Sequence, residues 1–209
     1  MRLLVAGASG RTGRLFTHLA LEHGHEVTAL VRDPSGFGAP QRHLCVVQGD
    51  VLVPDTFSHA VAGQDAVISM IAPRPRRDGL VYVEGTRNLA DAAAAAGVQR
   101  FLVVSAEGAG VSSGALPLAY RIVLQIPVVA RLYPDIVRME RELMTRTDLD
   151  WTIVRAALLT NGPATAEYRA AVGDVVPKGL RISRADLAAF LVAVVETRAY
   201  LCQRVALAY

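Results

Sequence analysis

The sequence predicts an α/β fold in which a doubly wound parallel sheet forms a single domain over residues 1–209. Short apolar, β-branched runs alternate with longer segments of helical period, which is the pattern of parallel strands joined by crossover helices. A chain of 209 residues is long enough for one well-buried domain and too short for separate cofactor and substrate domains of ordinary size. A glycine cluster between the first apolar run and the first helical segment agrees with this fold.

The expected strands are short and apolar. Residues 67–71 and 101–104 read as continuous apolar strands, as in the interior of a sheet covered on both faces. The six expected strands are residues 2–7, 26–31, 44–47, 66–70, 100–105 and 150–155.

Helical periodicity predicts the segments between these strands and one segment after the last. The alanine-rich stretch ends before Gly97, a residue that commonly terminates helices. The expected helices are residues 11–23, 55–62, 79–96, 135–147 and 184–198.

Two segments, residues 106–134 and 156–179, interrupt the regular alternation. Both contain turn-forming glycines and prolines, and both follow the carboxyl end of a predicted strand. Ligands bind at that edge of open α/β sheets, so we expect these segments to cover the substrate. For residues 106–134, a surface helix packed on the core or on a partner subunit is an equally good interpretation.

The composition argues against several classes of protein. Hydrophobic residues make up 52% and charged residues 20%, which is typical of a folded globular chain. The net charge of +3 and the pI near 9.1 come from arginines spread along the chain, so no nucleic-acid partner is expected. No apolar stretch approaches the roughly 18 to 20 residues of a bilayer-spanning helix, so no membrane partner is expected either.

The first apolar run and the cysteines bear on location and metal binding. Residues 3–6 meet the glycine cluster too early to form the apolar core of a signal peptide, so we expect a cytoplasmic protein. Cys45 and Cys202 lie far apart and lack the spacing of a zinc site. We expect both cysteines to be small core residues, and we expect no metal site.

The glycine cluster, residues 7–13, predicts a dinucleotide site. It follows a strand, opens a helix and falls inside a βαβ unit of about 30 residues. Residues without a Cβ permit the tight turn and let the backbone approach a pyrophosphate. The free N–H groups and the positive dipole end of the following helix then attract the phosphate charge.

Arg32 and Asp33, at the end of the second strand, bear on the choice of dinucleotide. An arginine here pairs with the 2′-phosphate of NADP, whereas an acidic residue binds the ribose 2′-hydroxyl of NAD. Arg32 stands at the mouth of the strand and can make a bidentate contact, so the sequence favours NADP(H). Asp33 leaves NAD(H) possible. Arg11, inside the glycine cluster, is a second candidate for the same phosphate.

Two further turns lie on the cofactor edge. Asp50 follows the third strand, where its carboxylate is expected either to accept from the exocyclic amine of adenine or to stabilise its own turn. Residues 72–78 follow the fourth strand and contain three arginines, which are expected either to contact phosphate or a charged ligand or, for at least two of them, to be solvated.

Motifs along nearly the whole chain resemble the atypical short-chain dehydrogenase/reductases of the NAD(P)-binding, NmrA-like group. Within that group, the length and the stretch from Arg138 to Arg155 are similar to the biliverdin reductase B, or flavin reductase, type. The motifs that carry the resemblance are residues 7–13, 31–34, 49–51, 62–67 and 150–155.

The resemblance implies a Rossmann fold with NADPH at the strand edge and hydride transfer to a flat conjugated acceptor. It assigns the 2′-phosphate to Arg32, the adenine to Asp50 and Val51, and the nicotinamide side to Ser105. It assigns the pyrophosphate to Gly7, Gly10, Thr12 and Gly13, and Ser9 and Arg11 are expected to bind the cofactor as well. The expected cofactor wall is Met70, Ile71, Ala72 and Arg74.

The usual catalytic pair of short-chain dehydrogenases, Tyr-x-x-x-Lys, is missing from the sequence. The only lysine is Lys178, and no tyrosine lies four residues before it. All five histidines lie at or before His59, in the predicted cofactor half, which argues against a histidine acid near the later loops. Ser105 is followed by Ala106, where members of the group commonly carry a second serine.

Seven polar residues remain as catalytic candidates: Ser105, Glu107, Tyr120, Tyr133, Arg138, Arg155 and Tyr168. Ser105 is the best of them, because it stands at the carboxyl end of a strand. Tyr133 is as well interpreted as a packing anchor, and Arg138 as a solvated partner of Glu142 at i,i+4.

The sequence therefore predicts an NADPH-dependent oxidoreductase that reduces a flavin, a quinone or a polycyclic aromatic ketone. Without a tuned acid, the proton would come from water or from the stabilised anion of the acceptor. Two alternatives stay open: an NmrA-like redox sensor without turnover, and an NAD(P)-dependent epimerase or dehydratase. The expected partner is a small conjugated substrate, and the chain is expected to be a monomer or a homodimer.

Overall fold

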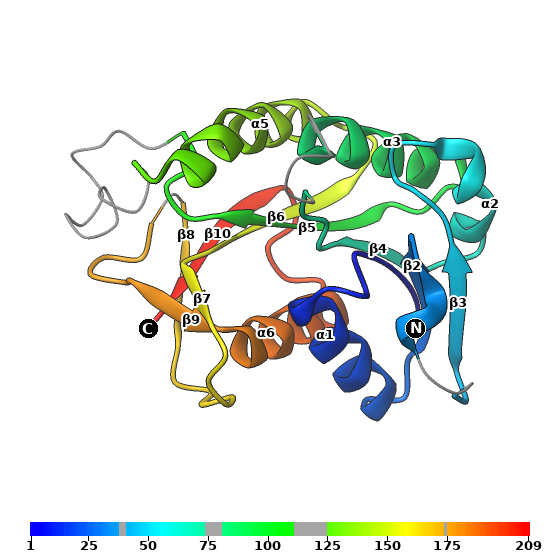
Figure 1. Cartoon of the computed structure of the whole chain (residues 1–209), viewed down its shortest axis with the longest axis horizontal. Helices are drawn as coiled ribbons and strands as arrows, with labels where there is room; N and C mark the ends of the chain where they lie inside the picture. Colours follow the sequence, from blue (N-terminus) through cyan, green and yellow to red (C-terminus); the bar gives the residue numbers. More distant parts are fainter. Residues whose placement is uncertain (38–40, 74–80, 111–124, 174) are drawn as a thin grey trace.

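The computed structural model describes residues 1–37, 41–73, 81–110, 125–173 and 175–209. In this part of the chain, an eight-stranded sheet forms the middle of three layers (Figure 1). One face is covered by α1 (Arg11–Glu22) and α6 (Arg184–Thr197). The other face is covered by α2 (Ser58–Val61), α3 (Val81–Ala95) and α5 (Pro127–Met144). The predicted doubly wound α/β fold is confirmed.

The main sheet has the strand order β3-β2-β1-β4-β5-β6-β10-β8. Neighbouring strands run parallel except β8, which pairs antiparallel with β10 at one edge. The strands of the main sheet are β1 (Arg2–Ala6), β2 (Glu26–Val31), β3 (Leu44–Gln48), β4 (Ala66–Ser69), β5 (Arg100–Ala106), β6 (Asp150–Ala156), β8 (Arg169–Val172) and β10 (Gln203–Ala208). A separate parallel pair consists of β7 (Leu158–Thr160) and β9 (Arg181–Ser183).

The strand order reverses direction at β1, which determines where a ligand can enter. The chain continues from β1 to β2 and β3 on one side, and returns to β4 on the other side. Ala6 is in register with Leu30 of β2 and with Ser69 of β4, so the three strands end at the same level. The loops that follow β1 and β4 leave in different directions, and a crevice opens between them at such a point. The glycine cluster lies at this crevice.

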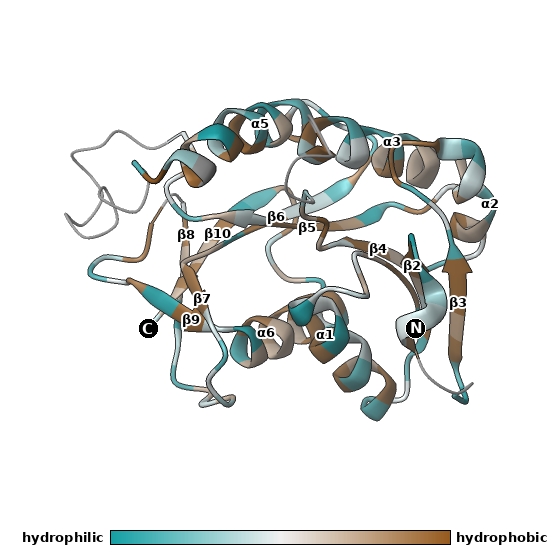
Figure 2. Ribbon diagram, in the orientation of Figure 1, coloured by the Kyte–Doolittle hydropathy of each residue, from teal (hydrophilic) through white to brown (hydrophobic). Residues whose placement is uncertain are grey.

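Apolar side chains hold the three layers together. Phe16 of α1 and Leu191 of α6 are fully buried on one face of the sheet. Leu89 of α3, Phe101 of β5 and Met139 of α5 are buried on the other face. Figure 2 shows apolar strands between helices whose outer sides are more polar. Each fully buried side chain of this kind contributes about 1.5 to 3 kcal/mol, so the packing holds the carboxyl edge of the sheet in place.

All six predicted strands are observed within one residue of their expected ends. The sequence reading missed β10, whose six residues follow a tight turn in which Tyr200 and Cys202 have positive φ. Part of the predicted loop 156–179 is also extended, because β7 and β8 lie in it. These short strands pair with segments that are distant in sequence, so local pattern alone gives little sign of them.

Two predicted helices have different bounds in the structure. The segment predicted as a helix over 55–62 is divided into the 3₁₀ helix η2 (Pro54–Thr56) and α2, with the fully buried Phe57 between them. A second 3₁₀ helix, η1 (Pro34–Phe37), follows β2. The helices predicted at 11–23, 79–96 and 184–198 are confirmed over the described residues as α1, α3 and α6. Within the described residues, no helix is both long and apolar enough to cross a membrane.

The helix predicted over 135–147 begins earlier, at Pro127, and contains Pro134. Proline has no N–H to donate to the carbonyl four residues back, which is why the sequence indicates a helix start there. Hydrogen bonds made by the residues on either side of Pro134 hold the helix in place where this backbone hydrogen bond is missing. The Tyr133 hydroxyl donates to the Glu107 carbonyl at 2.8 Å, and the Asp135 carboxylate accepts from the Tyr82 N–H at 2.9 Å. Residues 127–134 thus form a helix packed on the core, the alternative interpretation of this segment.

The expectation that both cysteines are core residues is wrong. Cys45 and Cys202 are exposed. Cys45 lies on β3, an edge strand of the sheet, and Cys202 lies in the turn before β10.

Asp186 fastens the first turn of α6 to the loop that precedes it. Its carboxylate accepts from the N–H groups of Thr165 and Ala166 at 2.9 and 2.8 Å, and from the Tyr209 hydroxyl at 2.6 Å. Burial by itself raises the pKa of this carboxyl, but the hydrogen bonds outweigh burial and the pKa lies below its ordinary value. Asp186 therefore stabilises the fold in its ionised form.

We expect the Asp186→Asn variant to unfold more easily than the parent at neutral pH, by about 1.5 to 3 kcal/mol for a lost charge-assisted bond. Because the pKa is lower in the folded than in the unfolded chain, this stabilisation is present above about pH 4 and disappears as the pH falls through the folded pKa. Urea unfolding at a series of pH values measures the difference. A difference that stays constant into acid would contradict the assignment, and the exposed Asp55→Asn variant is the control.

Candidate functional site

The backbones of β1, α1 and β4 meet at the glycine cluster. Gly7 has a φ of +80°, and a Cβ at this position would overlap the carbonyl of Met70 after β4. A Cβ on Gly13 would overlap the carbonyl of Gly7, while Gly10 leaves slightly more room, with 3.1 Å to the same oxygen. Only glycine fits at positions 7 and 13 without a shift of the backbone.

The amino terminus of α1 is left open to an anion. Gly10 is its N-cap residue and supplies no side-chain hydrogen bond, and the first turn has no acidic residue. The first N–H groups of the helix have no partner within the helix, and the helix dipole adds positive potential at this end. This arrangement fits a phosphate group, which accepts from such N–H groups.

A small cavity of about 140 Å³ lies beside the glycine cluster. Arg32 lines it, half-buried at the end of β2. Asp33 does not line it, and its Oδ1 accepts from the Ser35 N–H at 2.9 Å at the start of η1. The described lining residues are Gly7, Ser9, Gly10, Leu30, Val31, Arg32, Gly49, Val51, Met70, Ile71, Ala72 and Val81.

Asp50 stabilises its own turn, one of the two roles considered for it. Its Oδ1 accepts from the Leu52 N–H at 3.0 Å, and Asp50 is not among the residues that line the cavity, although Gly49 and Val51 are. Arg14 was missed by the sequence reading. Its guanidinium donates to the carbonyls of Ser9 and Gly36 at 3.1 and 2.8 Å, which joins the glycine cluster to the loop after β2.

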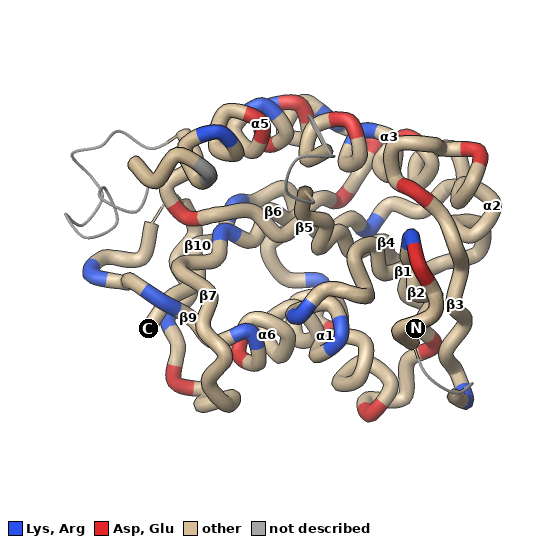
Figure 3. The backbone as a smooth tube through the Cα atoms, in the orientation of Figure 1, with Lys and Arg blue, Asp and Glu red and all other residues tan. Residues whose placement is uncertain are grey.

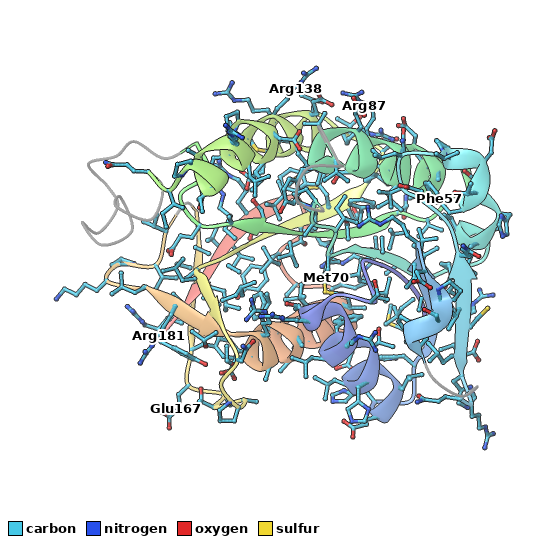
Figure 4. All side chains as sticks on the ribbon, viewed as in Figure 1. Phe57, Met70, Arg87, Arg138, Glu167 and Arg181 are labelled. Carbon is cyan, nitrogen blue, oxygen red and sulfur yellow. The ribbon has the colours of Figure 1, made fainter. Side chains whose placement is uncertain are left out.

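A larger cavity of about 620 Å³ continues from the same edge toward α5 and β7. It shares Gly10 and the 70–72 wall with the small cavity, so the two form one continuous site. Met70 lies between the sheet edge and α1 (Figure 4). The remaining lining residues are mostly apolar: Arg11, Thr12, Gly13, Tyr82, Val104, Ser105, Ala106, Val129, Leu132, Tyr133, Ile136, Ala156, Ala157, Leu158, Leu159 and Arg184.

Ser105 is fixed by a buried polar network behind the cavity. Its hydroxyl donates to Glu140 Oε1 at 2.5 Å, and Arg155 donates to the same carboxylate from Nε at 3.0 Å and from a terminal nitrogen. All three side chains are almost fully buried. Glu140 does not line the cavity, so the Ser105 proton that is donated to it points away from the cavity. The serine oxygen can therefore accept a hydrogen bond from a ligand, but it is not set to donate one.

Two tyrosines also face the cavity. The Tyr133 hydroxyl donates to the Glu107 carbonyl, so the packing role considered for Tyr133 is realised as a hydrogen bond to the loop after β5. Tyr82 was not predicted. Burial, together with the nearby Asp135 and Tyr133, raises the pKa of Tyr82 to about 12. Its hydroxyl therefore stays protonated at neutral pH.

Two arginines line the larger cavity on its α1 and α6 side. Arg11 and Arg184 line the larger cavity from the first turns of α1 and α6 (Figure 3 shows basic residues at both helix starts). Burial, and then the charge of Arg11, lowers the pKa of Arg184. Arg184 donates to Asn161 Oδ1 at 2.7 Å and to the Leu159 carbonyl at 3.3 Å. Neither of these acceptors carries a charge, so an anionic ligand is electrostatically favoured between the two arginines.

Several predicted residues are not brought to this site. Arg138 is exposed on α5, points away from the sheet (Figure 4) and pairs with Glu142 at 3.1 Å, as its alternative interpretation held. Glu107 is buried next to the site; its carboxylate accepts from the Val176 N–H, and burial raises its pKa. Tyr168 packs edge-on against Phe190. Arg74 and Tyr120 lie outside the described residues.

Another concave surface, of about 260 Å³, lies between α3 and α5 on the outside of the molecule. Ion pairs join residues that line it, including Arg87 with Glu142 and Arg146 with Asp91. The exposed Arg87 and Arg138 mark this outer side in Figure 4. Because its charged side chains already pair with one another and it is remote from the glycine cluster, we assign the site to the strand edge.

The buried network of Ser105, Glu140 and Arg155 should contribute to the stability of the fold. Removal of Glu140 leaves the Arg155 charge buried without its carboxylate, so we expect Glu140→Ala to lower the free energy of unfolding by about 3 to 5 kcal/mol. The matched control is Glu142→Ala on the same helix, where the ion pairs with Arg87 and Arg138 are exposed. Its cost should stay within about 1 kcal/mol. Equal losses in chemical denaturation would show that the network does not hold the site together.

Comparison with known proteins agrees with the geometry of the glycine cluster. Residues 7–198 match the family model described as NAD(P)H-binding. A photosystem II assembly factor Ycf39 from Synechocystis is 30% identical over 168 residues, which cover 78% of this chain and 46% of that protein. The chain spans less than half the length of this relative, and about a third of another curated relative that it matches.

Solved structures share the whole fold. An anaerobillin reductase, ChuY from Escherichia coli O157:H7, superposes with a TM-score of 0.83 at 23% identity, over 100% of this chain and 97% of that one. SP1627 from Streptococcus pneumoniae, described as an NADH-flavin reductase, has a TM-score of 0.80 at 25% identity, over 100% and 99% of the two chains. These matches confirm the resemblance inferred from the sequence motifs. The chain belongs to the NAD(P)H-binding family.

Proposed function

We propose that this protein is an NADPH-dependent oxidoreductase that transfers hydride to a flat conjugated acceptor, namely a flavin, a quinone or a polycyclic aromatic ketone. The observation that carries the proposal is the combination of an apolar cavity with two predicted catalytic hydroxyls, those of Ser105 and Tyr133, that donate into the protein and not into the cavity. Ser105 donates to Glu140 and Tyr133 donates to the Glu107 carbonyl. An acceptor that spreads the incoming charge over its own conjugated system does not need a positioned acid.

The glycine cluster and Arg32 fit NADPH. In the proposal, the pyrophosphate accepts from the open N–H groups at the start of α1, and glycine at positions 7 and 13 permits the close backbone approach that forms this turn. Arg32 binds the 2′-phosphate, because it lines the small cavity whereas the Asp33 carboxylate is engaged by Ser35. Val51 packs against the adenine, and Ile71 belongs to the wall between the two cavities.

Ser105 orients the nicotinamide in this proposal. When bound, NADPH supplies the hydride, and the task of the chain is to hold the reacting faces in contact. The Ser105 oxygen is available to accept from the carboxamide N–H group, and Glu140 with Arg155 keeps the hydroxyl in that orientation. Ser105 is therefore proposed to contact the cofactor, and not to serve as the proton donor.

The acceptor binds against the wall formed by α5 and β7. Leu132 and Ile136 project into the large cavity from α5, and Leu158 and Leu159 line it from β7 with 39% and 37% of their surfaces exposed. A flat aromatic molecule covers such a surface and removes water from it. The likeness to a protein described as an NADH-flavin reductase favours a flavin among the possible acceptors. The proton then comes from water or stays on the stabilised anion.

The proposal is tested by the initial rate of NADPH oxidation with FMN, FAD, a naphthoquinone and an anthraquinone, with NADH measured alongside. We expect turnover with at least one acceptor and faster turnover with NADPH. Tight NADPH binding without oxidation by any of them would contradict the reductase and favour a sensor. Ser105→Ala should lower the rate and leave NADPH affinity nearly unchanged.

Arg32 should decide between the two dinucleotides. One charge-assisted contact with phosphate contributes roughly 1.5 to 3 kcal/mol, so we expect Arg32→Glu to weaken NADPH binding at least about tenfold while NADH binding changes little. Arg42→Glu makes the same charge change before β3, at the opposite edge of the sheet, and is the control. Equal weakening of both dinucleotides by Arg32→Glu, measured by fluorescence titration, would make Arg32 a structural residue.

A side chain at the N-cap of α1 should block both dinucleotides. Gly10→Val fills the space in front of the open N–H groups, so we expect NADPH and NADH binding to fall together. The matched variant is Gly162→Val, because a Cβ at Gly162 makes only ordinary contacts of 3.9 Å and lies outside both cavities. If Gly10→Val folds, as circular dichroism would show, and still binds either dinucleotide normally, the pyrophosphate does not lie at this turn.

A further inference from the structure

A cluster of His23, His25 and Glu196 lies on the side of the molecule opposite the carboxyl edge. His23 caps the carboxyl end of α1, His25 precedes β2, and Glu196 is near the carboxyl end of α6. His23 Nδ1 and His25 Nε2 both lie 2.9 Å from the same atom, Glu196 Oε1. The cluster joins two helices that pack side by side beneath the sheet (Figure 1).

The three side chains converge on one point. Their potential ligand atoms all lie within 4.8 Å of one another. In a tetrahedral zinc site with bonds of about 2.1 Å, neighbouring ligand atoms lie roughly 3.4 Å apart. The 2.9 Å separations between each imidazole nitrogen and the carboxylate oxygen are slightly shorter, so a small outward rotation of the side chains makes room for an ion.

The chemistry of the cluster also suits a metal. Two imidazole nitrogens and a carboxylate oxygen form a donor set that zinc uses in proteins, with a further position left for water. The His23 side chain is 44% exposed and that of Glu196 34% exposed, so an ion can enter from solvent.

The buried side of the cluster is ordered by His25. Its side chain is only 9% exposed, and its Nδ1 lies 3.3 Å from the amino group of Met1. This contact restricts the rotation of the imidazole ring. His18 and Glu22 also pair on α1, at 3.2 Å, but they are far more exposed and bring no third ligand within reach among the described residues.

We propose that His23, His25 and Glu196 form a binding site for a divalent transition metal of the zinc type, which links the carboxyl end of α1 to the carboxyl end of α6. No local pattern predicts this site, because Glu196 is 171 residues from His25. When the ion binds, the ring protons between the two histidines and Glu196 move to the other ring nitrogens or to water, and the three ligand atoms bond the ion instead. Since the site is remote from the glycine cluster, its role is to stabilise the fold.

The test is a calorimetric titration of the chelator-treated, full-length protein with zinc chloride, together with thermal unfolding. We expect one zinc ion per chain and a Tm that rises with zinc concentration, because an ion that binds only the folded state stabilises it by mass action. His23→Ala should weaken binding at least about tenfold and abolish the Tm shift. Glu196→Gln, which keeps the shape of the side chain, should do the same.

The control is His18→Ala, which removes an exposed histidine from the same helix and should leave affinity and Tm shift unchanged. The proposal is wrong if the parent protein does not bind zinc. It is also wrong if His23→Ala binds as well as the parent, or if His18→Ala weakens binding as much as His23→Ala does. Circular dichroism without metal confirms that each variant is folded, so that a lost Tm shift reports the site.

Discussion

The close approach of three backbones at the glycine cluster is the constraint on which the rest of the site depends. The turn after β1 passes so near the carbonyl of Met70 that Gly7 has no room for a Cβ, and α1 begins so near the same turn that Gly13 has none either. Because of this close approach, the amino terminus of α1 points into the crevice where the strand order reverses. The same contact places residues 70–72 between the two cavities, so a ligand at the helix start extends along the 70–72 wall toward Ser105.

The far half of the site depends on a buried ion pair. Glu140 and Arg155 satisfy each other in a position where a single charge would be costly, and Ser105 takes its orientation from them. The network joins the ends of β5 and β6 to α5, which also carries the apolar wall of the large cavity. Asp135, one turn earlier, joins the same helix to the start of α3. Binding surface and scaffold are thus parts of one rigid arrangement, which is what hydride transfer between two flat molecules requires.

Sequence reasoning succeeded where the signal is local. The six apolar strands and the glycine turn depend on neighbouring residues, as does the position of Arg32 at the end of β2. Sequence reasoning failed where the partner of a residue is distant in the chain, or where tertiary contacts override a local signal. Glu140 meets Ser105 across 35 positions, and Arg184 meets Asn161 across 23, so neither role is visible in a local pattern. Pro134 indicated a helix start, but tertiary contacts of Tyr133 and Asp135 carry the helix through it. For Arg138, by contrast, a local pattern was enough: the i,i+4 pairing with Glu142 was the correct interpretation.

The most direct test of the account is a crystal structure of the protein with NADP⁺ bound. The account predicts the pyrophosphate at the N–H groups that follow Gly10, the 2′-phosphate at Arg32 and the nicotinamide beside Ser105, with its exposed face toward Leu132 and Leu158. A dinucleotide bound with its nicotinamide outside the large cavity, or with Arg32 turned away from the ribose, would contradict it. Such a result would show that the dinucleotide does not reach the apolar cavity. Hydride transfer to an acceptor bound there would then have no structural basis.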